Sequence, residues 1–351
     1  MTVELRGSVQ RADGGMRVAS LTGIRAVAAL LVVATHAAYT TGKYTHGYAG
    51  LVYSRLEIGV PIFFVLSGFL LFRPWVSAAE SGTSSPGLAR YARHRARRVL
   101  PGYLVTVLAT FAIYTVFTVG ESPGQSWAGL LRYLTLTQIY TDNFVLTYLH
   151  PGLSQMWSLA VEVSFYAALP LLAHLLLTVL CRGRWQPEVL LAGLFGLAMI
   201  SPLWLIVVHS TDLLPSAAGM WLPAHLSWFA GGMALAVLQR LGVRCRAIVA
   251  LPLAIGLYLL ASTEIAGHIT GPDTWWQPLA KSVLYGGIVI MFGHLVLAWI
   301  WLDVMLAIPA DAAKSIASHQ GRAGATTYFY HYELPRIEAW LKVVSRRDST
   351  C

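Results

Sequence analysis

The stretch MWSLAVEVSFYAALPLLAHLLLTVL, residues 156–180, decides the fold class. It is long enough and apolar enough for one helix to cross a lipid bilayer. One carboxylate, Glu162, interrupts it, and a charge inside the hydrocarbon is costly unless it is paired or takes part in function. Glu162 is therefore the first candidate for a functional residue.

The chain as a whole shares this apolar character. Hydrophobic residues make up 56% of its 351 residues and charged residues only 12%, which excludes an ordinary soluble domain. A net charge of +9 would suit a nucleic-acid partner, but the basic residues lie in short segments between apolar runs rather than in one stripe with exposed aromatic residues. We therefore expect an all-α polytopic membrane protein, a bundle of about eight to ten transmembrane helices, with the lipid bilayer and not nucleic acid as its partner.

Eight apolar runs come close to the roughly 20 residues that a helix needs to cross the membrane. These runs are 19–40, 58–72, 99–119, 156–180, 188–208, 220–238, 247–264 and 277–302. Two further segments stay open as spans. Arg132 interrupts 127–139, which suits an interfacial helix, and 325–344 carries several charges that make it a poor apolar segment.

The placement of arginine predicts the orientation. Arginines gather before the first run and after the second, fourth and sixth runs, which are connections on one side of the membrane. By the positive-inside rule, the N-terminal segment 1–18 and these basic loops are cytoplasmic. The opposite connections hold few cations, chiefly Lys43, Arg55 and Arg132. The expected location is the inner (plasma) membrane of a bacterium.

The sequence predicts one membrane domain over 19–344 and a tail over 345–351. We expect no signal peptide, because the first apolar run is long enough to remain as a span, and no appended hydrolase-like domain. The three cysteines, Cys181, Cys245 and Cys351, have neither disulfide nor metal-ligand spacing. We therefore expect three free thiols and no metal site.

Arg25 and His36 share one face of the first run. Eleven residues correspond to about 1100° of helical rotation, about 20° past three full turns, and to a rise of about 16 Å. Val32 lies between them on that face. In one interpretation Arg25 extends to the interface and His36 bonds to a neighbouring carbonyl group; in the other, both are functional.

Two more segments combine apolar and polar features. Ser67-Gly68-Phe69 lies in the second run, where a small residue beside an aromatic one indicates either close helix packing or a functional motif, although not a nucleophile elbow. In the basic segment 90–103, Arg95 and Arg98 would share a helix face and could grip phosphate groups by bidentate contacts. A purely topological role is the alternative for that segment.

These segments together resemble the acyltransferase-3 family of integral membrane O-acyltransferases. The resemblance covers most of the chain and is strongest over 19–170. The family has an arginine and a histidine at this spacing in its first helix, and FFVLSGFLL, 63–71, is similar to its second-helix signature. Its paired arginines, followed by a proline and an aromatic residue, are matched by Arg95, Arg98, Pro101 and Tyr103.

The chain departs from the family pattern at three places. His94 stands where many members have another arginine, and Val163 stands where a second acid usually follows Glu162. The segment YFYHY, 328–332, resembles a late-helix signature but lacks its preceding Ser-Tyr-Gly pattern. The role of the second acid and the form of the last helices are therefore open.

The resemblance implies roles for residues throughout the first half of the chain. Catalysis is expected of His36, Glu162 and Arg25. Donor binding is expected of Arg93, Arg95, Arg98, Ser67, Gly68, Phe69 and Tyr103. The acceptor or its channel is expected to be lined by Trp157, Ser158 and Tyr166.

Glu162 lies about six residues from the start of its apolar run, a depth similar to that expected for His36. A carboxylate bonded to an imidazole fixes its tautomer and raises its basicity, as a general base for a hydroxyl group requires. Alternatively, Glu162 neutralises an intramembrane arginine such as Arg25.

The expected function is therefore an O-acyltransferase. It would take an acetyl or other short acyl group from cytoplasmic acyl-CoA, with no permanently bound cofactor. The acceptor would be a hydroxyl group of a glycan, a glycolipid or a lipophilic metabolite. The alternative is a transporter or flippase in which Arg25, His36 and Glu162 relay protons, although inverted repeats and broken helices in matching halves are not visible.

Overall fold

The computed structural model describes residues 19–45, 47–117, 124–141, 149–243, 247–267 and 274–307. Within these ranges the regular elements are helical and include no strand. Six helices are long and apolar enough to cross a membrane: Leu21–Thr40, Gly47–Ser81, Leu88–Val116, Pro151–Leu180, Pro187–Ser210 and Ser216–Arg240. The all-α polytopic class is confirmed.

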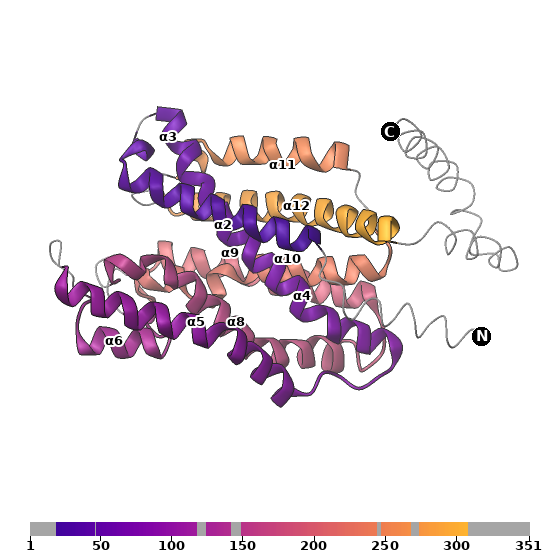
Figure 1. Cartoon of the computed structure of the whole chain (residues 1–351). Helices are drawn as coiled ribbons and strands as arrows, with labels where there is room; N and C mark the ends of the chain where they lie inside the picture. Colours follow the sequence, from indigo (N-terminus) through magenta and orange to yellow (C-terminus); the bar gives the residue numbers. More distant parts are fainter. Residues whose placement is uncertain are drawn as a thin grey trace, which may run out of the picture. The chain divides into compact units, whose positions relative to one another are not determined.

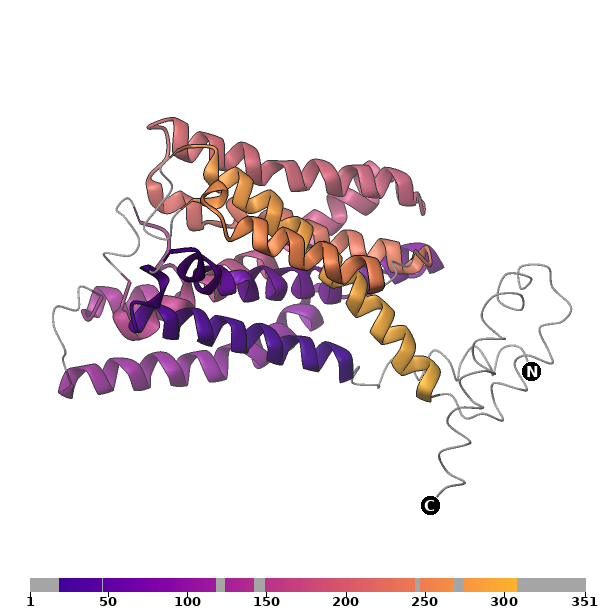
Figure 2. The same cartoon turned by 90° about the horizontal axis from the view of Figure 1, so that it is seen from above.

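Within the first unit most of the longer helices run roughly side by side, as Figures 1 and 2 show. The α-helices are α2 (Ala19–Thr40), α3 (Gly47–Ser54), α4 (Gly59–Ser81), α5 (Leu88–Val116), α6 (Trp127–Leu134), α8 (Trp157–Ala173), α9 (Pro187–Ser210), α10 (Leu222–Arg240), α11 (Ala247–Ala261) and α12 (Gln277–Ala307). Short 3₁₀ segments are η1 (Lys43–Thr45), η2 (Arg55–Ile58), η3 (Pro151–Met156), η5 (Ser216–Met220) and η6 (Glu264–Ala266), and η4 (His174–Leu180) is a π-helical end of the α8 span.

The chain divides into two units, the first reaching Trp299 and the second beginning at Ile300. In the second unit the described residues are the end of α12. The two last expected spans each contain a helix: α11 is short, with 15 residues, and α12 has 31. The segment 325–344 lies outside the described residues.

The prediction of a basic loop after the second span is wrong, because most of these arginines lie in helices. Arg73 lies inside α4, which ends at Ser81, and Gly82 follows it in a left-handed conformation with φ of 62°. Such a glycine is a common helix C-cap. Since α5 begins at Leu88, the arginines that follow form its first turns, consistent with the good helix propensity of arginine.

The open segment 127–139 contains α6, whose 8 residues are too short to cross a membrane. Its N-terminus is capped by Ser126, whose hydroxyl oxygen accepts a hydrogen bond from the amide of Gly129 at 3.0 Å. Tyr103 of α5 donates its hydroxyl to the carbonyl oxygen of Tyr133 at 2.5 Å. Burial in this cluster raises the pKa of Tyr133 to about 12.

Cys181 lies directly after the span Pro151–Leu180 and is a free, buried thiol. Burial raises the pKa of this thiol, which makes it a poor nucleophile. The other two cysteines lie outside the described residues. Within the described ranges, histidine, cysteine and acidic residues form no cluster of three or more that could hold a metal ion.

The centre of the first unit is the contact between α4 and α10 (Figure 1), where two glycines let the backbones meet. A Cβ atom on Gly68 would overlap the carbonyl oxygen of Phe229, and one on Gly232 would overlap that of Val65. Small residues serve such close approaches between membrane helices. Phe229 also stacks on Phe165 of α8, with ring centroids 4.0 Å apart, so three helices share this core.

We predict that Gly68→Ala destabilises the protein by about 1–3 kcal/mol, because the added methyl group forces α4 and α10 apart. Gly232→Ala should do the same from the opposite side of the contact. Gly196→Ala in α9 is the matched control, since no atom lies within 4 Å of its added Cβ. Thermal unfolding of detergent-purified variants measures the effect, and equal melting temperatures for all three would contradict it.

Candidate active site

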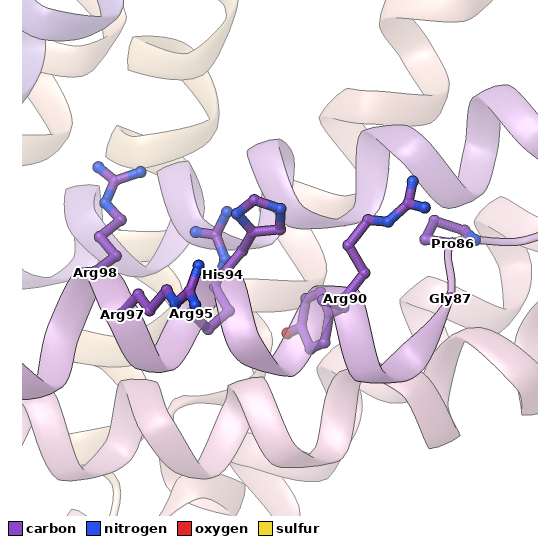
Figure 3. A pocket seen from close by; sticks show the side chains of 8 residues that line it. Pro86, Gly87, Arg90, His94, Arg95, Arg97 and Arg98 are labelled. Atoms are coloured by element: carbon purple, nitrogen blue, oxygen red, sulfur yellow. The ribbon is translucent and has the colours of Figure 1, made fainter.

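A basic pocket of about 590 Å³ lies along the first turns of α5. Figure 3 shows its basic side chains following one another along the helix. It is lined by Pro86, Gly87, Arg90, Tyr91, His94, Arg95, Arg97 and Arg98. Arg90, His94 and Arg98 repeat every four residues and therefore share a face. Since its lining includes four arginines and no acid, the pocket suits a ligand with several negative charges.

The inner side of this pocket meets α8 at Tyr166. The guanidinium carbon of Arg95 lies 6.0 Å from the centroid of the Tyr166 ring. The hydroxyl of Tyr91 donates a hydrogen bond to the Tyr166 carbonyl oxygen at 3.1 Å. The Nε atom of Arg95 is buried without a hydrogen-bond partner among the described residues. Arg95 thus joins the basic pocket to the interior of the bundle.

Glu162 lies one helical turn before Tyr166 and joins α8 to α4. Its Oε1 atom accepts a hydrogen bond from the Tyr166 hydroxyl at 2.6 Å and another from the hydroxyl of Ser67. The half-buried carboxylate is therefore held by two hydroxyl groups. This satisfies a charged group that would otherwise be costly in a membrane domain.

Arg25 of α2 completes the arrangement. It is half-buried and lies close enough to Glu162, Arg95 and Arg98 for their charges to interact. Arg25 therefore interacts with one carboxylate and with two guanidinium groups of α5. The result is a series of polar groups from the basic pocket to the centre of the bundle, which we call the polar path: Arg98, Arg95, Tyr166, Glu162, Ser67 and Arg25.

A family model described as an acyltransferase domain matches residues 18–316. The chain belongs to the acyltransferase-3 family. The family predicted from the sequence is therefore confirmed. No solved structure matches the chain.

Curated relatives of this acyltransferase-3 protein include two bacterial proteins at about the same similarity. Peptidoglycan O-acetyltransferase OatA of Listeria monocytogenes is 30% identical over 208 residues, which are 57% of this chain and 30% of that protein. Acyltransferase MdmB of Streptomyces mycarofaciens is 31% identical over 244 residues, 65% of this chain and 59% of that protein. The chain thus spans less than two thirds of either relative.

The expected contact between His36 and Glu162 is not among those of the described residues. The sequence places Glu162 about six residues into its run, but the helical segment begins earlier, at Pro151. Glu162 is therefore roughly 16 Å from that end and level with Arg25. The alternative interpretation, in which Glu162 balances Arg25, agrees better with this geometry.

His36 lies instead beside the connection between α3 and α4. On α2, Ala28 and Val32 pack against Gly59, where an added Cβ atom would meet both. His36 is one turn beyond Val32, and η2 also packs on α2, so His36 lies near the level of η2. Its ring makes an edge contact with Tyr39, with centroids 6.1 Å apart.

Several other expected residues lie outside the polar path. Arg93 is exposed and does not line the basic pocket, whereas Arg90 and Arg97 do. Tyr103 faces α6 and donates its hydrogen bond to Tyr133 of that helix. Gly68 serves the helix contact described above. Phe69 is buried with the guanidinium of Arg73 5.5 Å from its ring centroid, and Ser158 bonds to the carbonyl of Gln155.

A second polar cluster was not predicted from the sequence. Lys281 of α12 lies 2.5 Å from the carboxylate of Glu57, which also accepts a hydrogen bond from Tyr285 at 3.0 Å. The fully buried Arg55 donates to the carbonyl oxygen of Ala261 at 2.7 Å. In the sequence, Glu57 and Lys281 are visible only as charged residues near the starts of two apolar runs. They are more than 200 positions apart, so spacing cannot show that they form a pair.

We predict an energetic coupling between Arg25 and Glu162. Each single change, Arg25→Gln or Glu162→Gln, should lower the melting temperature in detergent, because it leaves the other charge uncompensated. The double variant should lose less free energy of unfolding than the sum of the two single losses, by about 0.5–3 kcal/mol. Glu162→Gln combined with Arg240→Gln is the control, since Arg240 pairs with Glu80 instead. Additive losses in both cycles would show that Arg25 and Glu162 do not interact.

Proposed function

We propose that this chain is a membrane O-acyltransferase that takes an acyl group from acyl-CoA at the basic pocket and transfers it to a hydroxyl group. The polar path is the observation that carries the proposal. It links the basic pocket to the interior of an apolar bundle, where Arg25 interacts with Glu162 and with two arginines of α5. Family membership and relatives named O-acetyltransferases support the same reaction class.

The donor end follows from charge and shape. Coenzyme A carries several phosphate groups at one end and its thioester at the end of a long, narrow chain. Guanidinium groups bind phosphate by paired hydrogen bonds in a fixed geometry. With the phosphates at Arg98 and Arg95, the narrow chain extends past Tyr166 toward Glu162 and Ser67. In this proposal the protein lies in the inner membrane, and the basic pocket and the N-terminus face the cytoplasm.

The chemistry requires a base and a group that balances charge. The acceptor oxygen attacks the thioester carbonyl and its proton passes to a base. The new ester bond forms, the carbon–sulfur bond breaks, and the base gives the proton to the departing sulfur, so that coenzyme A leaves as a thiol. Arg25 can balance charge along the path, and Glu162 with Ser67 can hold the narrow chain in place. We assign the role of the base to His36. It lies on α2, as Arg25 does, but toward the end of that helix that is farther from the proposed donor site.

Acceptors of two kinds are consistent with this proposal. The relative named peptidoglycan O-acetyltransferase favours a glycan hydroxyl. A glycolipid or a lipophilic metabolite remains the alternative. A transporter using Arg25, His36 and Glu162 as a relay would leave acyl-CoA intact. Release of the coenzyme A thiol by the purified protein therefore tests the function itself.

We predict that Arg95→Ala with Arg98→Ala weakens the binding of coenzyme A at least about tenfold, because two bidentate phosphate contacts are lost. Lysine at both positions should restore only part of the affinity, since an ammonium group cannot form the planar pair of bonds. Titration calorimetry measures the effect. The matched control removes the same charge at Arg93 and Arg184, which do not line the pocket. Equal affinities in both double variants would return the pocket to a topological role.

We predict that His36→Ala lowers acyl transfer by about 10²-fold or more, the usual contribution of a positioned base. The assay follows label from acetyl-CoA into alkali-labile esters in membranes that contain the protein. His174→Ala, which removes an exposed histidine from η4, is the control. Near-normal transfer by a correctly inserted His36→Ala variant would exclude the assignment.

A further inference from the structure

A second cavity, of about 260 Å³, lies at the opposite end of α4 from the basic pocket. Val60 and Pro61, in the first turn of α4, form one wall, and α8, α9, α10 and α12 contribute the others. The basic pocket begins at Pro86, five residues after α4 ends. Because α4 has 23 residues, its end near Pro86 lies roughly 34 Å along the axis from the cavity, whereas the other end of the basic pocket reaches Arg95 beside Tyr166.

Aromatic rings form much of this cavity. Trp157, Trp228 and Tyr285 line it together with His225. The His225 ring stacks on Trp228, with centroids 5.0 Å apart, and lies 5.3 Å from Trp157. Flat aromatic faces suit a ligand with a flat apolar face of its own, such as the C–H face of a pyranose ring.

The polar groups of the cavity are balanced in charge. Glu57 and Lys281 both line it and form the 2.5 Å ion pair described above. His225 is buried, and neither of its ring nitrogens has a hydrogen-bond partner among the described residues. A neutral imidazole offers one donor and one acceptor, and a hydroxyl-rich ligand can satisfy both. An anionic ligand would lack a free counter-charge because Lys281 is paired with Glu57, and an apolar alcohol has too few polar groups.

We propose that this cavity, the sugar pocket, binds one pyranose unit of a hydroxyl-rich acceptor. Its volume lies just below the roughly 300–1,000 Å³ of typical small-molecule sites, which suits a single sugar ring. The binding itself stands on the cavity alone. That the bound unit becomes acylated rests on the proposed function.

The sugar pocket lies next to the polar path along α4. Val60, Phe64 and Ser67 repeat along one face of α4, at spacings of four and three residues. Phe64 is buried, and its ring contacts Trp157 at 6.4 Å and His225 at 5.8 Å. It therefore separates the sugar pocket from Ser67, about 10 Å along the helix from Val60. Tyr39, the neighbour of His36, lies within electrostatic range of Glu57, so the proposed base lies near the pocket wall.

The test measures sugar binding without any donor. Methyl β-glucopyranoside is titrated into the purified chain and followed by saturation-transfer NMR, in an amine-oxide detergent because maltoside headgroups would compete. We expect the neutral glycoside to bind, and glucuronate and hexanol to bind more weakly. His225→Phe keeps the ring stacking but removes both nitrogens, so affinity should fall about tenfold without loss of stability. His174→Phe should leave it unchanged.

Three results would overturn the sugar pocket. They are glycoside binding that is unchanged in His225→Phe, stronger binding of glucuronate or hexanol than of the glycoside, and absence of glycoside binding to the intact chain. The proposed function fails separately. If the glycoside binds through His225 while coenzyme A thiol is never released, the pocket stands and the acyltransferase proposal falls.

Discussion

The cost of placing Glu162 inside an apolar bundle organises the structure around it. Its carboxylate needs partners, and it obtains them from Tyr166 of α8 itself, from Ser67 of α4 and from the positive charge of Arg25 on α2. Three helices, α2, α4 and α8, therefore meet at the Glu162 carboxylate. Removing water from this point strengthens every charge interaction in it, which favours a fixed arrangement over a loose one.

The two ends of α4 present opposite chemistry. At one end, arginines gather without acids and attract anions from a distance. At the other, charges are paired and aromatic rings dominate, so recognition depends on contact and shape. This separation suits the proposed pair of a highly charged donor and a neutral acceptor, because a pocket suited to one ligand would reject the other.

Hydropathy predicted most of the spans because the need to satisfy backbone groups in lipid leaves few alternatives to a helix. Hydropathy did not predict how deep a residue lies in the bundle, or which helices are neighbours. Glu162 was placed too near one end because the polar residues of η3 conceal the true start of the helical segment. The contacts of His225 and Lys281 depend on which helices are neighbours, and helical spacing within one segment carries no such information.

The reciprocal glycines of α4 and α10 bear on how the protein can move. Backbone meets backbone at Gly68 and Gly232, so a sliding step of either helix would drive a carbonyl oxygen into its neighbour. We therefore expect α4 and α10 to move together as one rigid unit. Any rearrangement that admits substrates therefore has to come from the helices packed around α4 and α10.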